Sequence, residues 1–105
     1  MIISVSDNDQ PTVVSSKNSP VEGRDNVTLT CVPATTDTIT GYEWYKDDSK
    51  ITINATNNTY SLPANKRANS GLYQCKVMTK NLPGLSRSEV KNVTFLCKLL
   101  LRLFD

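Results

Sequence analysis

Hydrophobic and polar residues alternate in several short segments of the chain, and turn-forming residues separate these segments. In 27–31 the side chains of Val27, Leu29 and Cys31 fall on one side, and two threonines fall on the other. Alternation with a period of two residues is typical of a β-strand with one buried face. The same pattern recurs in 42–46 and 72–77. These segments therefore predict half-buried strands.

Further short segments extend this pattern along the chain. Strands are also predicted around 12–16, 51–53, 59–62 and 89–96. The residues between the strands are rich in Gly, Pro, Asn, Asp and Ser, which favour turns. About seven short strands without a helix of ordinary length predict an all-β fold, a Greek-key sandwich of two antiparallel sheets.

The length of 105 residues fits one domain with a single modest core. We expect the domain to cover 11–96, with 1–10 as an N-terminal linker or the end of a preceding domain. The last segment, 97–105, is expected to be a linker or an added tail. The most apolar stretch contains Lys98 and Arg102 and spans about ten residues, where a membrane span needs roughly 20. No direct membrane insertion of this segment is therefore expected.

Two cysteines and the one tryptophan occupy inward positions of the predicted strands. Cys31 and Cys75 are 44 residues apart, and Trp44 lies between them. A disulfide between the cysteines would cross the core with the indole packed on it, and would stabilise the domain by about 4 kcal/mol. Tyr73 follows a turn at Gly71. Glycine has no side chain, so it leaves the backbone of this turn free of side-chain constraints. The tyrosine hydroxyl could therefore bond to the backbone of that turn.

The segments that carry these residues resemble the immunoglobulin superfamily. VEGRDNVTLTC, YEWYK and NSGLYQC are similar to its B-, C- and F-strand signatures, and the resemblance covers the expected domain. The short interval between the cysteines is closest to the C2 and I sets, as in adhesion molecules and receptors of the cell surface. The resemblance implies an inter-sheet disulfide and a core signature of Leu29, Trp44, Gly71 and Tyr73. Asn69 stands where the family usually has Asp, which puts the usual ion pair across the sheet in doubt.

Four sequons for N-linked glycosylation agree with the oxidising, extracellular location that a disulfide favours. They begin at Asn26, Asn54, Asn57 and Asn92. A polar, β-rich surface would produce some sequons by chance. Asn26 and Asn92 each precede an inward valine, so both should point outward, on opposite sheets. Glycans at both positions would partly cover the flat faces and favour contacts through loops or ends.

Cys97 is the third cysteine and has no partner within the chain once the core disulfide forms. It follows the last predicted strand. Three alternatives stay open for this residue: a link to another chain, a link to a cysteine of a following domain, or a free thiol beside the tail.

Charge and composition weigh against several classes of function. The net charge is +2 with scattered Lys and Arg, which gives no electrostatic case for nucleic acid. The chain has no His, no metal-ligand spacing and no glycine-rich phosphate loop. We therefore expect no catalytic residues, no metal site and no cofactor. The acidic pair Asp47 and Asp48 is predicted to be a solvated hairpin end.

The resemblance implies protein–protein recognition by an extracellular module of a receptor or adhesion protein. The predicted F–G loop, KNLPGLSR, has an apolar tip, and outward side chains of the C strand could extend a contact surface from it. The partner-binding candidates are Leu82, Pro83, Gly84, Leu85, Tyr45 and Glu43. The expected partner is a receptor, a counter-receptor, an adjacent immunoglobulin-like domain or a second copy of this chain.

Two other functions stay open. The chain could be a spacer in a multi-domain ectodomain, with the ligand site elsewhere. It could also be an intracellular I-set domain that bears load, which predicts reduced cysteines and no glycans. Carbohydrate recognition is less favoured because no outward arginine stands clearly alone on a strand, and Arg87 is the nearest example.

Overall fold

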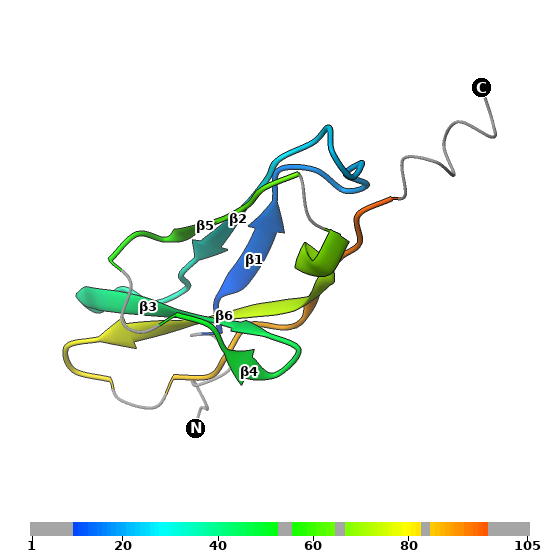
Figure 1. Ribbon diagram of the computed structural model, residues 1–105. Coiled ribbons are helices and arrows are strands. Elements are labelled where there is room, and N and C mark those ends of the chain that lie inside the picture. The colour runs from blue at the N-terminus through cyan, green and yellow to red at the C-terminus, as the bar shows by residue number, and fades with distance from the viewer. Residues whose placement is uncertain (1–9, 53–55, 65–66, 83–84, 97–105) are drawn as a thin grey trace.

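The computed structural model describes residues 10–52, 56–64, 67–82 and 85–96. Within this part, two antiparallel sheets pack face to face (Figure 1). The three-stranded sheet has the order β1-β2-β5, with β1 (Thr12–Ser15), β2 (Val27–Val32) and β5 (Thr59–Leu62). The four-stranded sheet has the order β4-β3-β6-β7, with β4 (Ser49–Lys50), β3 (Ile39–Lys46), β6 (Gly71–Thr79) and β7 (Lys91–Val93). The all-β, two-sheet sandwich predicted from the sequence is confirmed.

The segment before β2 bonds to both sheets. Its first part, β1, pairs with β2 in the three-stranded sheet. Val21 then forms a parallel bridge with Leu96, which follows β7 in the other layer. The amide of Leu96 donates to the carbonyl of Pro20 at 2.8 Å, and its carbonyl accepts from Glu22 at 2.9 Å. The first segment therefore ties one edge of the sandwich together.

The described chain begins and ends at opposite ends of the sandwich (Figure 1). Thr12 pairs with Val32, where β2 ends and the loop to β3 begins. The connection from β6 to β7 lies at this same end, because β6 runs antiparallel to β3. Leu96 lies at the other end, beside Val21. The chain thus enters next to the loop between β2 and β3 and next to the predicted F–G loop, which follows β6.

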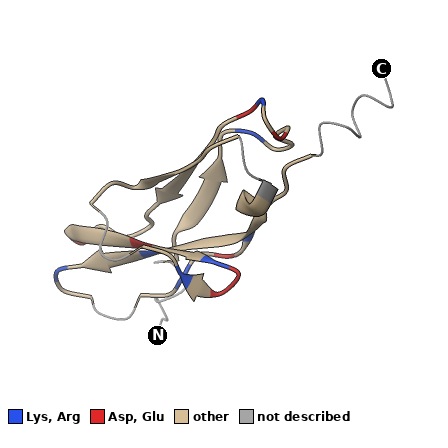
Figure 2. Ribbon diagram, in the orientation of Figure 1, with Lys and Arg blue, Asp and Glu red and all other residues tan. Residues whose placement is uncertain are grey.

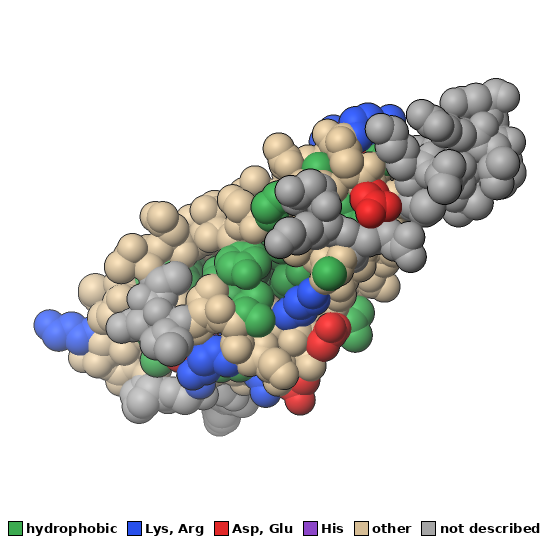
Figure 3. Space-filling view, in the orientation of Figure 1, with side chains coloured by type: hydrophobic (Ala, Val, Ile, Leu, Met, Phe, Trp, Pro, Cys, Tyr) green, Lys and Arg blue, Asp and Glu red, His purple; other side chains and the backbone are tan. Residues whose placement is uncertain are grey.

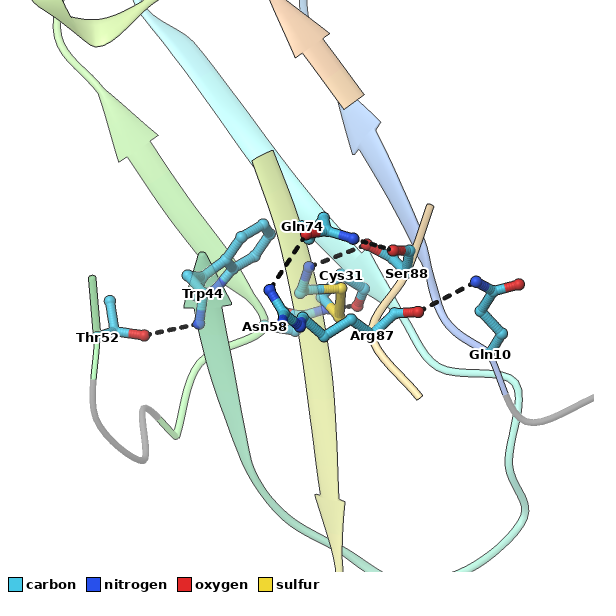
Figure 4. The surroundings of a disulfide bond; sticks show 9 residues. Gln10, Cys31, Trp44, Thr52, Asn58, Gln74, Arg87 and Ser88 are labelled. Carbon is cyan, nitrogen blue, oxygen red and sulfur yellow. Dashed lines mark hydrogen bonds between the residues drawn. A yellow bond between two sulfur atoms is a disulfide. The ribbon is translucent and has the colours of Figure 1, made fainter. Parts of the chain in front are cut away.

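The core is built around a disulfide between Cys31 on β2 and Cys75 on β6, which confirms the predicted pairing. The Cα atoms of the two residues are 6.0 Å apart, so the bond joins the two sheets directly. Trp44 is the register partner of Cys75 and lies fully buried near the disulfide (Figure 4). The remaining residues of this core cluster are Val13, Val27, Leu29, Tyr42, Leu62, Tyr73, Val77, Val93 and Phe95.

The turn between β3 and β4 is tighter than the sequence predicted. Asp47 and Asp48 both have positive φ, 50° and 70°, in the left-handed region that two-residue type I′ hairpin turns require. The amide of Asp47 donates to the carbonyl of Leu72 at 2.8 Å, and its carboxylate accepts from the amide of Leu72 at 3.0 Å. The returning strand therefore begins at Ser49, and its prediction over 51–53 was placed too late.

The last strand, β7, is shorter than the predicted 89–96, and Ser88 explains why it begins late. The amide of Ser88 donates to the carbonyl of Cys75 at 2.8 Å, and its buried hydroxyl accepts from the amide of Cys75 at 2.9 Å. A side-chain oxygen thus takes the place of a backbone carbonyl in the ladder. Glu89 and Val90 are then both exposed, and regular pairing resumes at Lys91. Such local irregularities are common in edge strands.

Tyr73 fills one end of the core and bonds to the turn before β6. Its side chain is 1% exposed, and its hydroxyl donates to the backbone carbonyl of Asn69 in the 3-10 turn Arg67–Asn69. Burial raises the pKa of Tyr73 to about 12, and the nearby Tyr60 and Asp47 add to this. The bond fixes the start of β6 against the preceding turn.

Removal of the disulfide should strongly destabilise the fold. A Cys31→Ala, Cys75→Ala double variant should lose about 4 kcal/mol in free energy of unfolding, because the bond closes a loop with a separation of 44 residues. Urea denaturation followed by the fluorescence of Trp44 measures this loss. Cys97→Ser is the control and should leave the unfolding midpoint unchanged. A loss of the same size in the control would contradict the pairing.

Tyr73→Phe should lower the free energy of unfolding by about 1 kcal/mol near neutral pH, because the carbonyl of Asn69 loses its donor. The folded pKa of about 12 lies above the ordinary value of 10.0. The stabilisation from the Tyr73 hydroxyl is therefore complete below about pH 10 and is lost as the pH rises toward 12. Denaturant titrations across this interval should show the difference between wild type and variant shrinking. A constant difference would refute the assignment.

Candidate functional site

Two loops meet at the end of the sandwich where the chain enters. Asp37, in the loop between β2 and β3, accepts hydrogen bonds from the backbone and side-chain nitrogens of Asn81, at 2.9 and 2.8 Å. It also accepts from the amide of Thr38 at 2.8 Å. The amide of Lys80 donates to the carbonyl of Thr38 at 2.9 Å. We call Asp37 and Asn81 the loop clasp, because they hold the two loops in one arrangement.

Within the loop clasp, the carboxylate of Asp37 is ionised at physiological pH. The hydrogen bond from the Asn81 side chain is the largest influence on Asp37, and it outweighs the opposing effect of burial. Together with the backbone bonds from Asn81 and Thr38, it lowers the pKa of Asp37 to about 2. The carboxylate therefore stays charged, and the clasp stays closed, well below neutral pH.

In the apolar tip that the sequence predicted at 82–85, the two leucines differ in exposure. Leu82 is 40% exposed, and its backbone is held by the hydroxyl of Thr79 through bonds of 3.0 and 3.1 Å. Leu85 is only 9% exposed, so its side chain packs inward. Pro83 and Gly84 are not among the described residues. Within the described part of this tip, Leu82 therefore offers the apolar surface.

Glu43 and Tyr45 lie on the outer face of β3, where the sequence predicted them, but both are engaged with neighbours. The Tyr45 hydroxyl donates to Glu43 at 2.9 Å, and the ammonium of Lys50 lies 3.1 Å from the same carboxylate. The guanidinium of Arg87 sits 4.3 Å from the centre of the Tyr45 ring and pairs with Asp48 at 2.7 Å. These side chains form a fixed polar surface along the four-stranded sheet.

The pKa values of the two candidate residues on β3 are shifted in directions that keep both side chains in their ordinary protonation states. Burial raises the pKa of Glu43, but the hydrogen bonds from Tyr45 and Lys50 outweigh it, so the pKa lies below the ordinary value. Burial, together with the bond to Glu43, raises the pKa of Tyr45. Near neutral pH the proton therefore stays on the phenol and the charge stays on the carboxylate.

Charged residues of both signs occur at several separate places along the ribbon (Figure 2). A group of hydrophobic side chains reaches the surface near the middle of the face shown in Figure 3. Among the described residues, no three His, Cys, Asp or Glu gather closely enough to hold a metal ion. No helix in that part of the chain is long and apolar enough to cross a membrane. Of the large hydrophobic residues that the structure describes, Val14, Val32, Leu72, Leu82 and Val90 are exposed.

Three of the four sequons fall in the described part of the chain. Asn26, Asn57 and Asn92 are all exposed, whereas Asn54 and the third cysteine, Cys97, lie outside the described residues. Asn26 immediately precedes β2, and Asn92 lies on β7, so the two belong to different sheets. Their side chains are therefore available at opposite layers of the sandwich.

Sequence reasoning did not identify Asp37, Asn81 or Ser88. Asp37 lies in a polar loop, where hydrophobic alternation carries no information, and Asn81 lies 44 residues further along the chain. Ser88 looks like an ordinary polar residue near a loop, although its hydroxyl is buried beside Cys75 (Figure 4). An Asp next to a turn is the only local signal for the clasp, and it is a weak one.

Comparisons with known proteins agree with this architecture. A family model described as immunoglobulin domain matches residues 10–95. The structure is similar to the second Ig-C2 domain of human Fc-receptor like A, with a TM-score of 0.68 and 19% identity, over 83% of this chain and 96% of that chain. It is also similar to the three N-terminal domains of the highly immunogenic outer capsid protein of bacteriophage RB49. That match has a TM-score of 0.64 and 24% identity, over 85% of this chain and 28% of that chain. At these identities the similarity shows the fold.

Asp37→Ala should loosen the connection between the two loops. The backbone amide of Asn81 loses its acceptor, so its hydrogen exchange with solvent should accelerate by roughly an order of magnitude. Exchange measured by NMR reads this out residue by residue. Asp37→Asn keeps one acceptor oxygen and should show a smaller change. An unchanged exchange rate at Asn81 in Asp37→Ala would refute the clasp.

Proposed function

We propose that this chain, which belongs to the immunoglobulin domain family, is an extracellular module of a cell-surface receptor or adhesion protein. In this proposal it recognises a protein partner through the end of the sandwich that carries the loop clasp and Leu82. The observation that carries the proposal is the clasp itself, in which one carboxylate joins the loop after β2 to the loop after β6.

Pre-ordered loops favour recognition. Fixing a loop on binding loses conformational entropy, so loops that are already held in place leave more of the contact energy for affinity. Leu82 directly follows Asn81 and is 40% exposed. An apolar side chain within a polar surround is the usual composition of a binding centre and its rim.

An extracellular location is supported by the disulfide and by the sequons. Disulfides persist in oxidising compartments, whereas cytosolic thiol systems keep most cysteines reduced. Acceptors for glycans must be exposed, and Asn26 and Asn92 both are. The two residues belong to different sheets. Glycans on both layers would restrict face-on contacts, which leaves the ends of the sandwich for a partner.

The path of the chain favours a second candidate function, that of a spacer whose loop end packs against a preceding domain. The side-chain amide of Gln10 donates to the carbonyl of Arg87 at 3.1 Å, so the chain enters beside the connection between β6 and β7. A domain attached ahead of Gln10 would stand close to the loop clasp. Leu82 would then be buried between two domains instead of against a partner.

Leu82→Asp should weaken partner binding at least tenfold without lowering the unfolding temperature, because Leu82 is already 40% exposed and is not part of the core cluster. Fluorescent tetramers of the chain, screened on a library of displayed surface proteins, identify the partner and compare the variants. Val14→Asp is the matched control, since Val14 is 49% exposed on β1. This control should bind like the wild type.

Leu82→Asp also distinguishes partner recognition from the spacer function. In a protein that includes the natural preceding domain, Leu82→Asp should leave the stability of the pair unchanged if the loop end is free for a partner. Unchanged tetramer binding together with a less stable domain pair would overturn the recognition proposal and establish the spacer.

A further inference from the structure

An open hollow lies beside Asn26, where β2 begins and β5 ends. Its volume is about 350 Å³, and its lining consists of Asn26, Val27, Thr28, Ser61, Leu62 and Pro63. The strands pair here, Val27 with Leu62 and Thr28 with Ser61. The valine and leucine are buried, whereas the other four lining residues are exposed. The accessible wall therefore combines an amide, two hydroxyls and a proline ring.

The amide of Asn26 is held in one orientation. Its oxygen accepts a hydrogen bond from the backbone of Ala64 at 2.8 Å. Its nitrogen donates to no acceptor within the described part of the chain, and this nitrogen is the atom to which an N-linked sugar is joined. Asn26, Val27 and Thr28 form a sequon. A sugar on this nitrogen would therefore start at the wall of the hollow.

We propose that Asn26 carries an N-linked glycan and that the first N-acetylglucosamine of this glycan occupies the hollow. A sugar ring has hydroxyls at its rim and C–H groups on its faces. The hydroxyls of Thr28 and Ser61 match the rim, and the ring of Pro63 matches a face. The volume falls at the lower end of the range in which proteins hold small ligands. The inference rests on the extracellular location proposed above.

The modification itself needs a lipid-diphosphate-linked oligosaccharide as donor, which the secretory pathway supplies. A bond forms between the Asn26 nitrogen and the anomeric carbon of the sugar. The bond from that carbon to the diphosphate oxygen breaks, and one amide proton is released. The amide oxygen is unchanged by this step, so its hydrogen bond from Ala64 can persist in the glycosylated protein.

Asn92 provides a comparison within the same chain. Its amide oxygen accepts from the hydroxyl of Thr94 at 2.9 Å, so it is bonded within its own sequon and not to a neighbouring strand. Asn92 lies on β7, an edge strand of the other sheet. A glycan there is expected to project into solvent. The sugar on Asn26, in contrast, would bridge β2 and β5 and stabilise their pairing.

The experiment uses two full-length proteins, each secreted behind a cleavable signal peptide from eukaryotic cells that make high-mannose glycans. One keeps the Asn26 sequon and carries Asn54→Gln, Asn57→Gln and Asn92→Gln. The other keeps the Asn92 sequon and carries Thr28→Val, Asn54→Gln and Asn57→Gln. Thr28→Val removes the first sequon but retains Asn26 and its bond to Ala64. Glycopeptide mass spectrometry measures the occupancy of each site.

Each protein is then compared in three forms: fully glycosylated, trimmed by an endoglycosidase to the first N-acetylglucosamine, and stripped by an amidase. The amidase converts Asn26 to Asp, whose carboxylate still accepts from Ala64. In the Asn26 protein, Tm should stay constant on trimming and fall by about 4 °C on stripping. In the Asn92 protein neither step should change Tm. Ser61→Trp, which fills the hollow, should abolish the fall in the Asn26 protein.

Three results would overturn the inference: no glycan on Asn26, a fall in Tm at the trimming step, or an equal fall when Asn92 is stripped. These outcomes do not depend on where the natural chain resides, because the signal peptide supplies the secretory route. The proposed location is tested separately, by labelling the natural protein on intact cells with a membrane-impermeant reagent. Failure of one proposal is therefore distinguishable from failure of the other.

Discussion

The bond between Cys31 and Cys75 is the constraint on which the rest of the structure depends. It connects β2 and β6, which lie in the interior of their sheets, and so sets the two layers against each other. Trp44 lies on β3, which pairs with β6, and it belongs to the same core cluster as the two cysteines. Once these three positions point inward, the alternation of a strand decides the orientation of the other side chains on β2, on β6 and on β3 from Tyr42 onward. The register of β3 is irregular between Ile39 and Gly41, so alternation does not extend to its first residues. The outward position of Glu43 and Tyr45 follows from that alternation.

Alternation predicted the central strands well because a buried face must be apolar along its whole length. It failed at both edges of the four-stranded sheet, where side chains replace backbone partners. The carboxylate of Asp47 accepts from Leu72 and allows the turn into β4 to close in two residues. The hydroxyl of Ser88 accepts from Cys75 and shifts the alternation before β7. Both bonds join residues distant in sequence, so no local pattern reveals them.

The candidate site was predictable to a smaller extent than the fold. The apolar character of the loop after β6 was visible in the sequence, and Leu82 is exposed there. The inward packing of Leu85 was not visible, because a loop with Pro and Gly has no periodicity from which to infer direction. The clasp between Asp37 and Asn81 was also hidden, since it links two loops that are adjacent only in the folded chain. Loop geometry therefore had to come from the structure.

The two proposed roles, recognition of a partner and packing against a preceding domain, would use the same end of the sandwich. Gln10 is bonded beside the connection between β6 and β7, so a preceding domain and a binding partner would approach the same loops. Burial of Leu82 contributes at most about 1.5–3 kcal/mol, which is less than the free energy lost when two bodies are fixed relative to each other. Either role thus needs further contacts in addition to Leu82. Asp37 is ionised near neutral pH, because its pKa is lowered to about 2, and its hydrogen bonds keep the two loops in place for such contacts. Ordered loops would favour contact with a binding partner and with a preceding domain alike.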